Sequence, residues 1–184
     1  MDWSQAKRDD YLNRLLGIII RRTFKSFGTV LEKNAYDAVI APHPARRNYF
    51  YAPYAFAAFN CIFETCDWRN EDHAGQVITF FFDKGHKNEG QLLDVAKRAL
   101  IGVDCLVQDV ISADDQFLPP LQAADLLAFE LCAEARTLAT PTNRYSRYPL
   151  LRLDEHPHEW LFINADRLTE RVAKLTRDGV FPEA

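Results

Sequence analysis

The sequence predicts an α/β fold, formed by one domain over residues 1–184 in which helices flank a sheet. From residue 76 onward, β-branched and aromatic runs alternate with longer amphipathic runs in the order strand, helix, strand, helix. The chain has 184 residues with 48% apolar and 12% aromatic content, which is enough for a buried core. Its net charge of −4 excludes a basic protein that coats nucleic acid, but not an enzyme with a local basic patch.

The N-terminal half predicts two helices separated by a strand and a loop. Apolar residues recur at helical spacing over 3–22, and their opposite face carries Arg and Asp. A short strand is expected at 24–31 and a polar, proline-containing loop at 41–48. The aromatic and alanine-rich run 49–66 predicts a buried helix that begins near Pro53, because proline is tolerated in a first turn.

The C-terminal half contains the clearest strand, "QVITFFFD" at 76–83. It is apolar on both faces, so we expect a central strand that is covered on both sides. The elements expected after it are a helix at 88–100, a strand at 105–111, a helix from Pro119 to about Leu138, a loop at 140–158, and a helix at 159–178 capped by Gly179.

The remaining composition indicates a cytoplasmic protein without a membrane segment. The N-terminus has no signal-peptide pattern, and the run "LLGIII" is too short to cross a bilayer. Four cysteines in apolar surroundings lack metal-ligand spacing, so we expect reduced and mostly buried thiols. A zinc site at Cys61 and Cys66 or at His156 and His158 is disfavoured by the spacing of these residues.

Two acids stand out against apolar surroundings. Asp125 lies in the run "FLPPLQAADLLAFE" on or near the apolar face of the expected helix, and Asp83 ends an apolar strand. Carboxylates from separate elements suit Mg²⁺ or Mn²⁺ and metal-dependent cleavage of phosphodiester bonds. The structural alternatives are an Asp125 that interacts with its helix N-terminus or pairs with a buried arginine, and an Asp83 that opens an Asx turn. Asp114 and Asp115 are either solvated loop acids or further ligands.

The segments "FFFDKG", "LVQDVIS" and "PPLQAADLLAFE", together with the N-terminal helix, resemble the DUF3800 family of the ribonuclease H-like superfamily. The resemblance covers most of the chain, and "LQ-x-AD" at 121–125 is its best signature. It implies a ribonuclease H-like fold, with a mixed sheet flanked by helices, and a metal-dependent nuclease in which Asp83 and Asp125 bind the metal. The motif also includes Gln122, for which the resemblance suggests no chemical role.

One departure from the family pattern concerns the N-terminus. Family members begin with a strand that ends in an Asp-Glu-Ser motif, whereas Met1 falls just before the first expected helix. We therefore expect an N-terminally incomplete domain whose strand 76–83 has an apolar, unpaired edge. Three hypotheses follow: a fragment of a longer product, a sheet completed by a homodimer or a strand-donating partner, and a degenerate, inactive relative.

The outer candidates for the site are His86, Glu89 and Asp115. His86 suits proton transfer or is a solvated loop residue, and Glu89 is a catalytic acid or a helix N-terminal acid. Nucleic acid as a partner requires cations, for which three loop clusters are candidates: Arg46 and Arg47, Lys84 and Lys87, and Arg144, Arg147 and Arg152. Surface arginines without a ligand are the alternative. The functional prediction is a nuclease, with a non-catalytic protein-binding module as the alternative.

Overall fold

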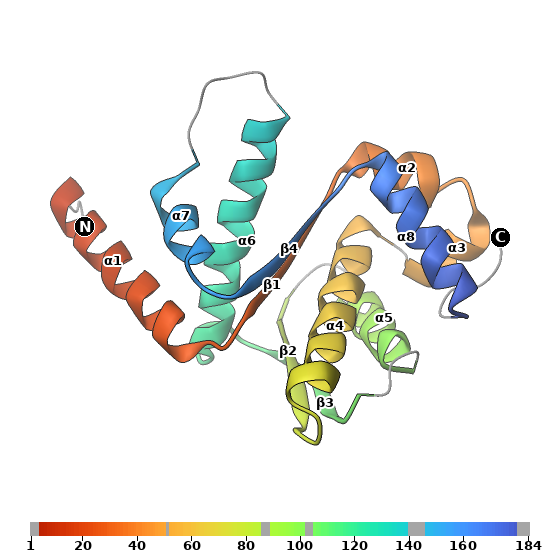
Figure 1. Ribbon diagram of the computed structural model, residues 1–184, viewed down its shortest axis with the longest axis horizontal. Coiled ribbons are helices and arrows are strands. Elements are labelled where there is room, and N and C mark those ends of the chain that lie inside the picture. The colour runs from red at the N-terminus through yellow and green to blue at the C-terminus, as the bar shows by residue number, and fades with distance from the viewer. Residues whose placement is uncertain (1–3, 51, 86–88, 102–104, 140–145, 180–184) are drawn as a thin grey trace. The chain divides into compact units, whose positions relative to one another are not determined.

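The computed structural model describes residues 4–50, 52–85, 89–101, 105–139 and 146–179. The chain is α/β, as the sequence predicts. It forms two compact units (Figure 1): unit 1 contains Met1–Gly28 and Gln122–Trp160, and unit 2 contains Thr29–Leu121 and Leu161–Ala184. Among the described residues, no helix has the length and apolar character needed to cross a membrane.

The described residues contain eight helices and four strands. In chain order they are α1 (Gln5–Arg22), β1 (Ser26–Leu31), α2 (Lys33–Val39), α3 (Pro44–Phe50), α4 (Pro53–Asp72), β2 (Ile78–Asp83), α5 (Glu89–Ile101), β3 (Val107–Ala113), α6 (Pro119–Leu138), α7 (Tyr148–Asp154), β4 (His158–Ile163) and α8 (Ala165–Arg177).

Unit 2 is organised around the parallel pair β2 and β3, with α5 between them in sequence. Parallel neighbours need such a crossover, because a tight turn joins only antiparallel strands. Phe80 and Phe82 on β2 and Val110 on β3 pack against the core, so alternate residues of both strands face the same side. Figure 1 shows α4 and α5 lying side by side, and both contribute to this core.

Aromatic side chains fill the centre of unit 2. Phe50, Phe56 and Phe59 are fully buried, and their rings meet edge to face with centroids 4.8 Å and 5.2 Å from that of Phe50. Edge-to-face contacts match the positive ring edge to the negative ring face, which stabilises such clusters beyond their apolar area. The run 49–66 is therefore aromatic because α3 and α4 converge on one core.

A buried polar network joins α8 to α4. Asn60 is inaccessible to solvent, and its amide donates to the Phe56 carbonyl at 2.8 Å. Its Oδ1 accepts from Arg171 Nε at 3.0 Å, while Arg171 also pairs with Glu64 at 2.5 Å. Because Asn60, Glu64 and Arg171 all have hydrogen-bond or ion-pair partners, the network fixes the position of α8 on α4.

Unit 1 contains α1, α7, nearly all of α6 and the first residues of β1 and β4. Gly28 lets β1 approach α6, because a Cβ at this position would collide with the Leu131 side chain. The Thr23 hydroxyl donates to the Ile19 carbonyl and also shares a hydrogen bond of 2.9 Å with Nε2 of the His156 ring. Burial lowers the pKa of His156, and neighbouring His158 lowers it further.

The strands β1 and β4 form a second parallel pair. The Ser26 amide donates to the Pro157 carbonyl at one end, and the Glu32 amide donates to the Ile163 carbonyl at the other. The residue numbers increase in the same direction along β1 and β4, so the two strands are parallel.

Several boundaries correct the sequence-based prediction. The predicted loop 41–48 largely belongs to α3, which Pro44 begins, and α2 was not predicted. The predicted loop 140–158 contains α7, and the first quarter of the predicted helix 159–178 belongs to β4. "HEWLFI" is rich in aromatic and β-branched side chains, which favour a strand, and helix α8 begins only after the Asn164 cap. Gly179 does adopt a positive φ of 71°, as expected for a C-cap.

The prediction that β2 is covered on both faces is wrong within the described residues. There β2 pairs with β3 alone, and the Phe81 side chain is 43% exposed on the face opposite Phe80 and Phe82. The prediction of mostly buried cysteines also needs correction. Cys66 is buried and Cys132 is exposed, whereas Cys61 and Cys105 are half-buried.

We predict that Asn60→Ala lowers the free energy of unfolding by about 1–3 kcal/mol, because the Nε–H of Arg171 then loses the Asn60 oxygen that accepts its hydrogen bond. Urea unfolding followed by circular dichroism measures the change. The control is Thr169→Ala on the exposed side of α8, where we expect a change within about 0.5 kcal/mol. Equal stabilities of the two variants would show that the network does not fix α8.

Candidate functional site at the carboxyl edge of the parallel strands

The carboxyl ends of β2 and β3 lie at the same edge of their sheet. The register pairs Phe82 with Ser112 and Asp83 with Ala113, and the Lys84 amide donates to the Ala113 carbonyl at 2.8 Å. The segments that follow β2 and β3 therefore leave the sheet at the same edge. Open α/β sheets build their binding sites at this edge. We call this the carboxyl edge and define it by Asp83, Lys84, Gly85, Ala113, Asp114 and Asp115.

Asp83 presents an exposed carboxylate at this edge. It follows Phe82, which faces the core, so the alternation of the strand directs Asp83 to the opposite side. Among the described residues, the Asp83 carboxylate accepts no hydrogen bond and forms no ion pair. The Asx-turn interpretation required a bond from this carboxylate to the following backbone, so the geometry favours an acid that is available to a ligand.

The turn after β2 positions Glu89 and gives it a structural role. Gly85 has a φ of 91°, a conformation that glycine adopts without strain, and its amide donates to Glu89 Oε2 at 3.0 Å. The nearby Ser112 hydroxyl lowers the pKa of Glu89 most, followed by the Gly85 amide, with Lys84 adding to them. The buried Ser112 hydroxyl falls short of full hydrogen-bond geometry, so the Gly85 contact is the firmer one.

Asp114 and Asp115 follow β3 and differ in their surroundings. Asp114 is exposed and its Oδ1 accepts from the Gln116 amide at 3.0 Å, which makes it the turn residue of an Asx motif. Asp115 is half-buried. The turn that Asp114 closes leads the chain from the sheet toward α6.

Asp125 occupies the first half of α6 and belongs to unit 1, whereas Asp83 belongs to unit 2. The sequence placed Asp125 on or near the apolar face of this helix, but the structure places it on an exposed face with Ala124, Ala128 and Phe129. That face carries apolar residues but is open to solvent in the structure, so the apolar pattern did not predict that Asp125 is exposed.

The buried acid of α6 is Glu130, which the sequence analysis did not single out. Its side chain is 2% exposed, Arg147 approaches it at 3.4 Å, and its Oε2 has no partner among the described residues. Burial raises the pKa of Glu130 and Arg147 lowers it, with burial the larger effect. Arg147 also lies over the Phe129 ring at 4.9 Å, so this predicted nucleic-acid residue has a structural role.

The other predicted nucleic-acid residues are scattered. Arg46 and Arg47 lie on α3, where Arg47 is exposed and the Nε of Arg46 is buried without a partner among the described residues. Lys84 is exposed at the carboxyl edge and supplies positive charge beside Asp83. The predictions for Lys87, Arg144 and the catalytic candidate His86 concern positions outside the described residues.

The acids of the carboxyl edge fit a hard cation in donor chemistry, because carboxylate oxygens are the ligands that Mg²⁺ and Mn²⁺ prefer. These acids are too few to supply all the ligands of a complete metal site. In the part of the chain that the structure describes, no three Asp, Glu, His or Cys side chains converge as metal ligands. Asp83 is therefore a candidate ligand rather than part of a formed cluster.

Comparisons with protein-family models, with curated protein sequences and with solved structures gave no match to this chain.

We predict that Glu89 stabilises the fold in its charged form only. Its pKa in the folded chain lies below the ordinary 4.5, so this stabilisation is present above pH 4.5 and is lost as the pH falls through the lower folded value. Urea unfolding of the wild type and of Glu89→Gln should differ at neutral pH and converge in acid. Glu170→Gln on α8 controls for the loss of a surface charge. A difference that persists unchanged below pH 4.5 would contradict this role.

Proposed function

We propose that this chain is a metal-dependent nuclease of the ribonuclease H-like kind, which cleaves phosphodiester bonds. The observation that carries the proposal is Asp83, an exposed acid without a protein partner among the described residues, at the carboxyl edge of two parallel strands. The resemblance of "FFFDKG" and "LQ-x-AD" to the DUF3800 family supports the same chemistry. The ribonuclease H-like sheet is part of this proposal.

Several residues at the carboxyl edge have distinct roles in the proposed activity. Asp83 would hold Mg²⁺ or Mn²⁺, and Asp115 is the further candidate ligand in the same unit. Such an ion supplies a Lewis acid for the phosphate and lowers the pKa of a bound water. Lys84 brings a cation to the approach of an anionic backbone, and the contact between Gly85 and Glu89 keeps the turn after Asp83 in place.

A non-catalytic binding module is the second candidate. Two observations favour it: the described residues lack a group of three metal ligands, and Phe81 is exposed on the open face of β2. A two-stranded sheet with apolar, unpaired edges takes up further strands readily. A second copy of the chain or a strand-donating partner would complete it.

We predict that Mn²⁺ binds the purified chain and that Asp83→Asn weakens this binding by more than about tenfold. Loss of a residue that only orients a metal ligand already lowers metal affinity by about this factor, so loss of the ligand itself should lower it at least as much. Isothermal titration measures the affinity, and a fluorescent oligonucleotide assay on the same samples measures cleavage. Asp109→Asn is the matched control, because Asp109 is an exposed acid on β3 away from the carboxyl edge. Asp125→Asn tests the acid of unit 1 by itself.

The outcomes separate the two candidates. Binding and cleavage that are lost in Asp83→Asn but kept in Asp109→Asn support the nuclease. Negligible binding of Mn²⁺ by the wild-type chain contradicts it and favours the binding module. Size-exclusion chromatography with light scattering then shows whether a second copy completes the sheet.

A further inference from the structure

Helix α1 is a basic segment in an acidic chain. Between Gln5 and Arg22, five basic side chains outweigh two acidic ones, which gives the helix a charge of +3. The whole chain carries −4, so the remaining residues together carry −7. Such an asymmetry is typical of a segment that binds a polyanion.

Three of the cations form a row along one side of the helix. Lys7, Arg14 and Arg21 are seven residues apart, which is close to two helical turns, and all three side chains are exposed. Successive members are separated by a rise of about 10.5 Å along the axis, at 1.5 Å per residue. The helix therefore presents evenly spaced positive charges rather than one cluster.

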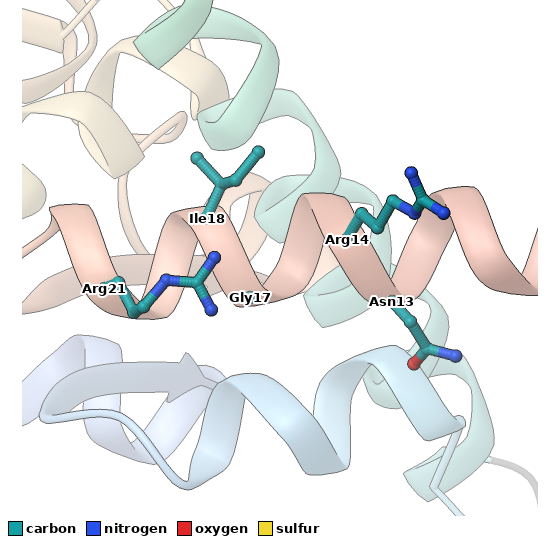
Figure 2. A pocket seen from close by; sticks show the side chains of 5 residues that line it. All are labelled: Asn13, Arg14, Gly17, Ile18 and Arg21. Atoms are coloured by element: carbon teal, nitrogen blue, oxygen red, sulfur yellow. The ribbon is translucent and has the colours of Figure 1, made fainter.

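An open hollow of about 460 Å³ lies beside this row, lined by Asn13, Arg14, Gly17, Ile18 and Arg21. Figure 2 shows the Arg21 side chain running back along the helix toward Gly17. A Cβ at position 17 would lie 3.2 Å from Arg21 Nη1, a closer approach than most Cβ atoms make. The glycine thus leaves the space in which the guanidinium lies against the helix.

The guanidinium groups of this hollow are accessible to an anion. Arg21 forms no hydrogen bond or ion pair among the described residues. Arg14 pairs with Asp10 at 3.0 Å, but the two side chains are 77% and 61% exposed. Water screens such a pair strongly, so a phosphate can take the place of the Asp10 carboxylate.

Side chains of α1 outside the basic row hold the helix within unit 1, where α7 contacts it. Leu16 is 1% exposed, and the Tyr148 hydroxyl donates to Asn13 Oδ1 at 2.6 Å. Both contacts lie within unit 1. The apolar side of α1 is therefore fixed, and the basic row remains on the solvent side.

We propose that the row of Lys7, Arg14 and Arg21 on α1 binds the phosphate backbone of a nucleic acid. Guanidinium groups bind phosphate in a bidentate manner, and the spaced row suits a repeating anion. The choice of nucleic acid among polyanions rests on the proposed nuclease function. An anionic membrane is a weaker fit, because binding to lipid scales with apolar area and only Tyr11 and Ile18 are large apolar side chains that α1 exposes by more than half.

Fluorescence anisotropy with a labelled single-stranded DNA of about 20 nucleotides, in EDTA and at several salt concentrations, tests this proposal. We expect the double variant Arg14→Gln/Arg21→Gln to bind at least about tenfold more weakly than the wild type. The slope of log K against log salt should become shallower by about 1.4, because each of the two arginines neutralises one phosphate and each neutralised phosphate of a single strand accounts for about 0.7. Lys174→Gln/Arg177→Gln removes the same charge from the exposed side of α8 and should bind like the wild type.

Equal affinities and salt slopes for the wild type and the α1 variant would overturn the proposal, as would a wild-type chain that does not bind the DNA. Vesicles of phosphatidylserine and phosphatidylcholine form a second arm. Binding to vesicles that needs Arg14 and Arg21, without binding to DNA, would assign the row to a lipid surface instead. Because EDTA removes divalent metal, the anisotropy measurement reports binding without metal-dependent cleavage, so a failed cleavage assay and a failed binding assay remain separate results.

Discussion

The parallel pairing of β2 with β3 is the constraint on which unit 2 depends. It requires a crossover, which α5 supplies, and it places alternate residues such as Phe80 and Val110 against the core beneath α4 and α5. The same register places Asp83 beside Ala113, so the exposed acid and the loop after β3 leave the sheet at one edge. The fold thus creates the candidate site as a consequence of how the strands pair.

Much of the fold follows from local patterns. The boundaries of α6 were predictable because Pro119 and Pro120 begin it, and β2 was predictable from its β-branched and aromatic run. The helix α7 and the strand β4 were not, because the short stretch 148–163 has no long periodicity and its identity depends on packing against α1 and pairing with β1. Tertiary context decides such short elements.

The candidate site was only partly predictable, and the two acids of α6 show why. Asp125 and Glu130 both interrupt one apolar run, yet Asp125 is exposed and Glu130 is 2% exposed. The run is apolar almost all round, so its sequence does not indicate which side faces the core. Asp83 was easier to place, because the end of a strand is marked by the change from apolar to polar residues. The basic row on α1 was visible as charge, but only the structure shows that Leu16 anchors the other side.

The most direct test of the central claim is to locate a bound divalent ion in solution. Substoichiometric Mn²⁺ added to the isotope-labelled chain broadens the amide signals nearest the ion in a two-dimensional nitrogen–proton spectrum. If the carboxyl edge binds the metal, signals of Asp83, Lys84 and Gly85 and of Ala113 broaden first, and Asp83→Asn abolishes the effect. Even broadening over the whole spectrum, or broadening confined to residues away from that edge, would contradict a metal site at Asp83.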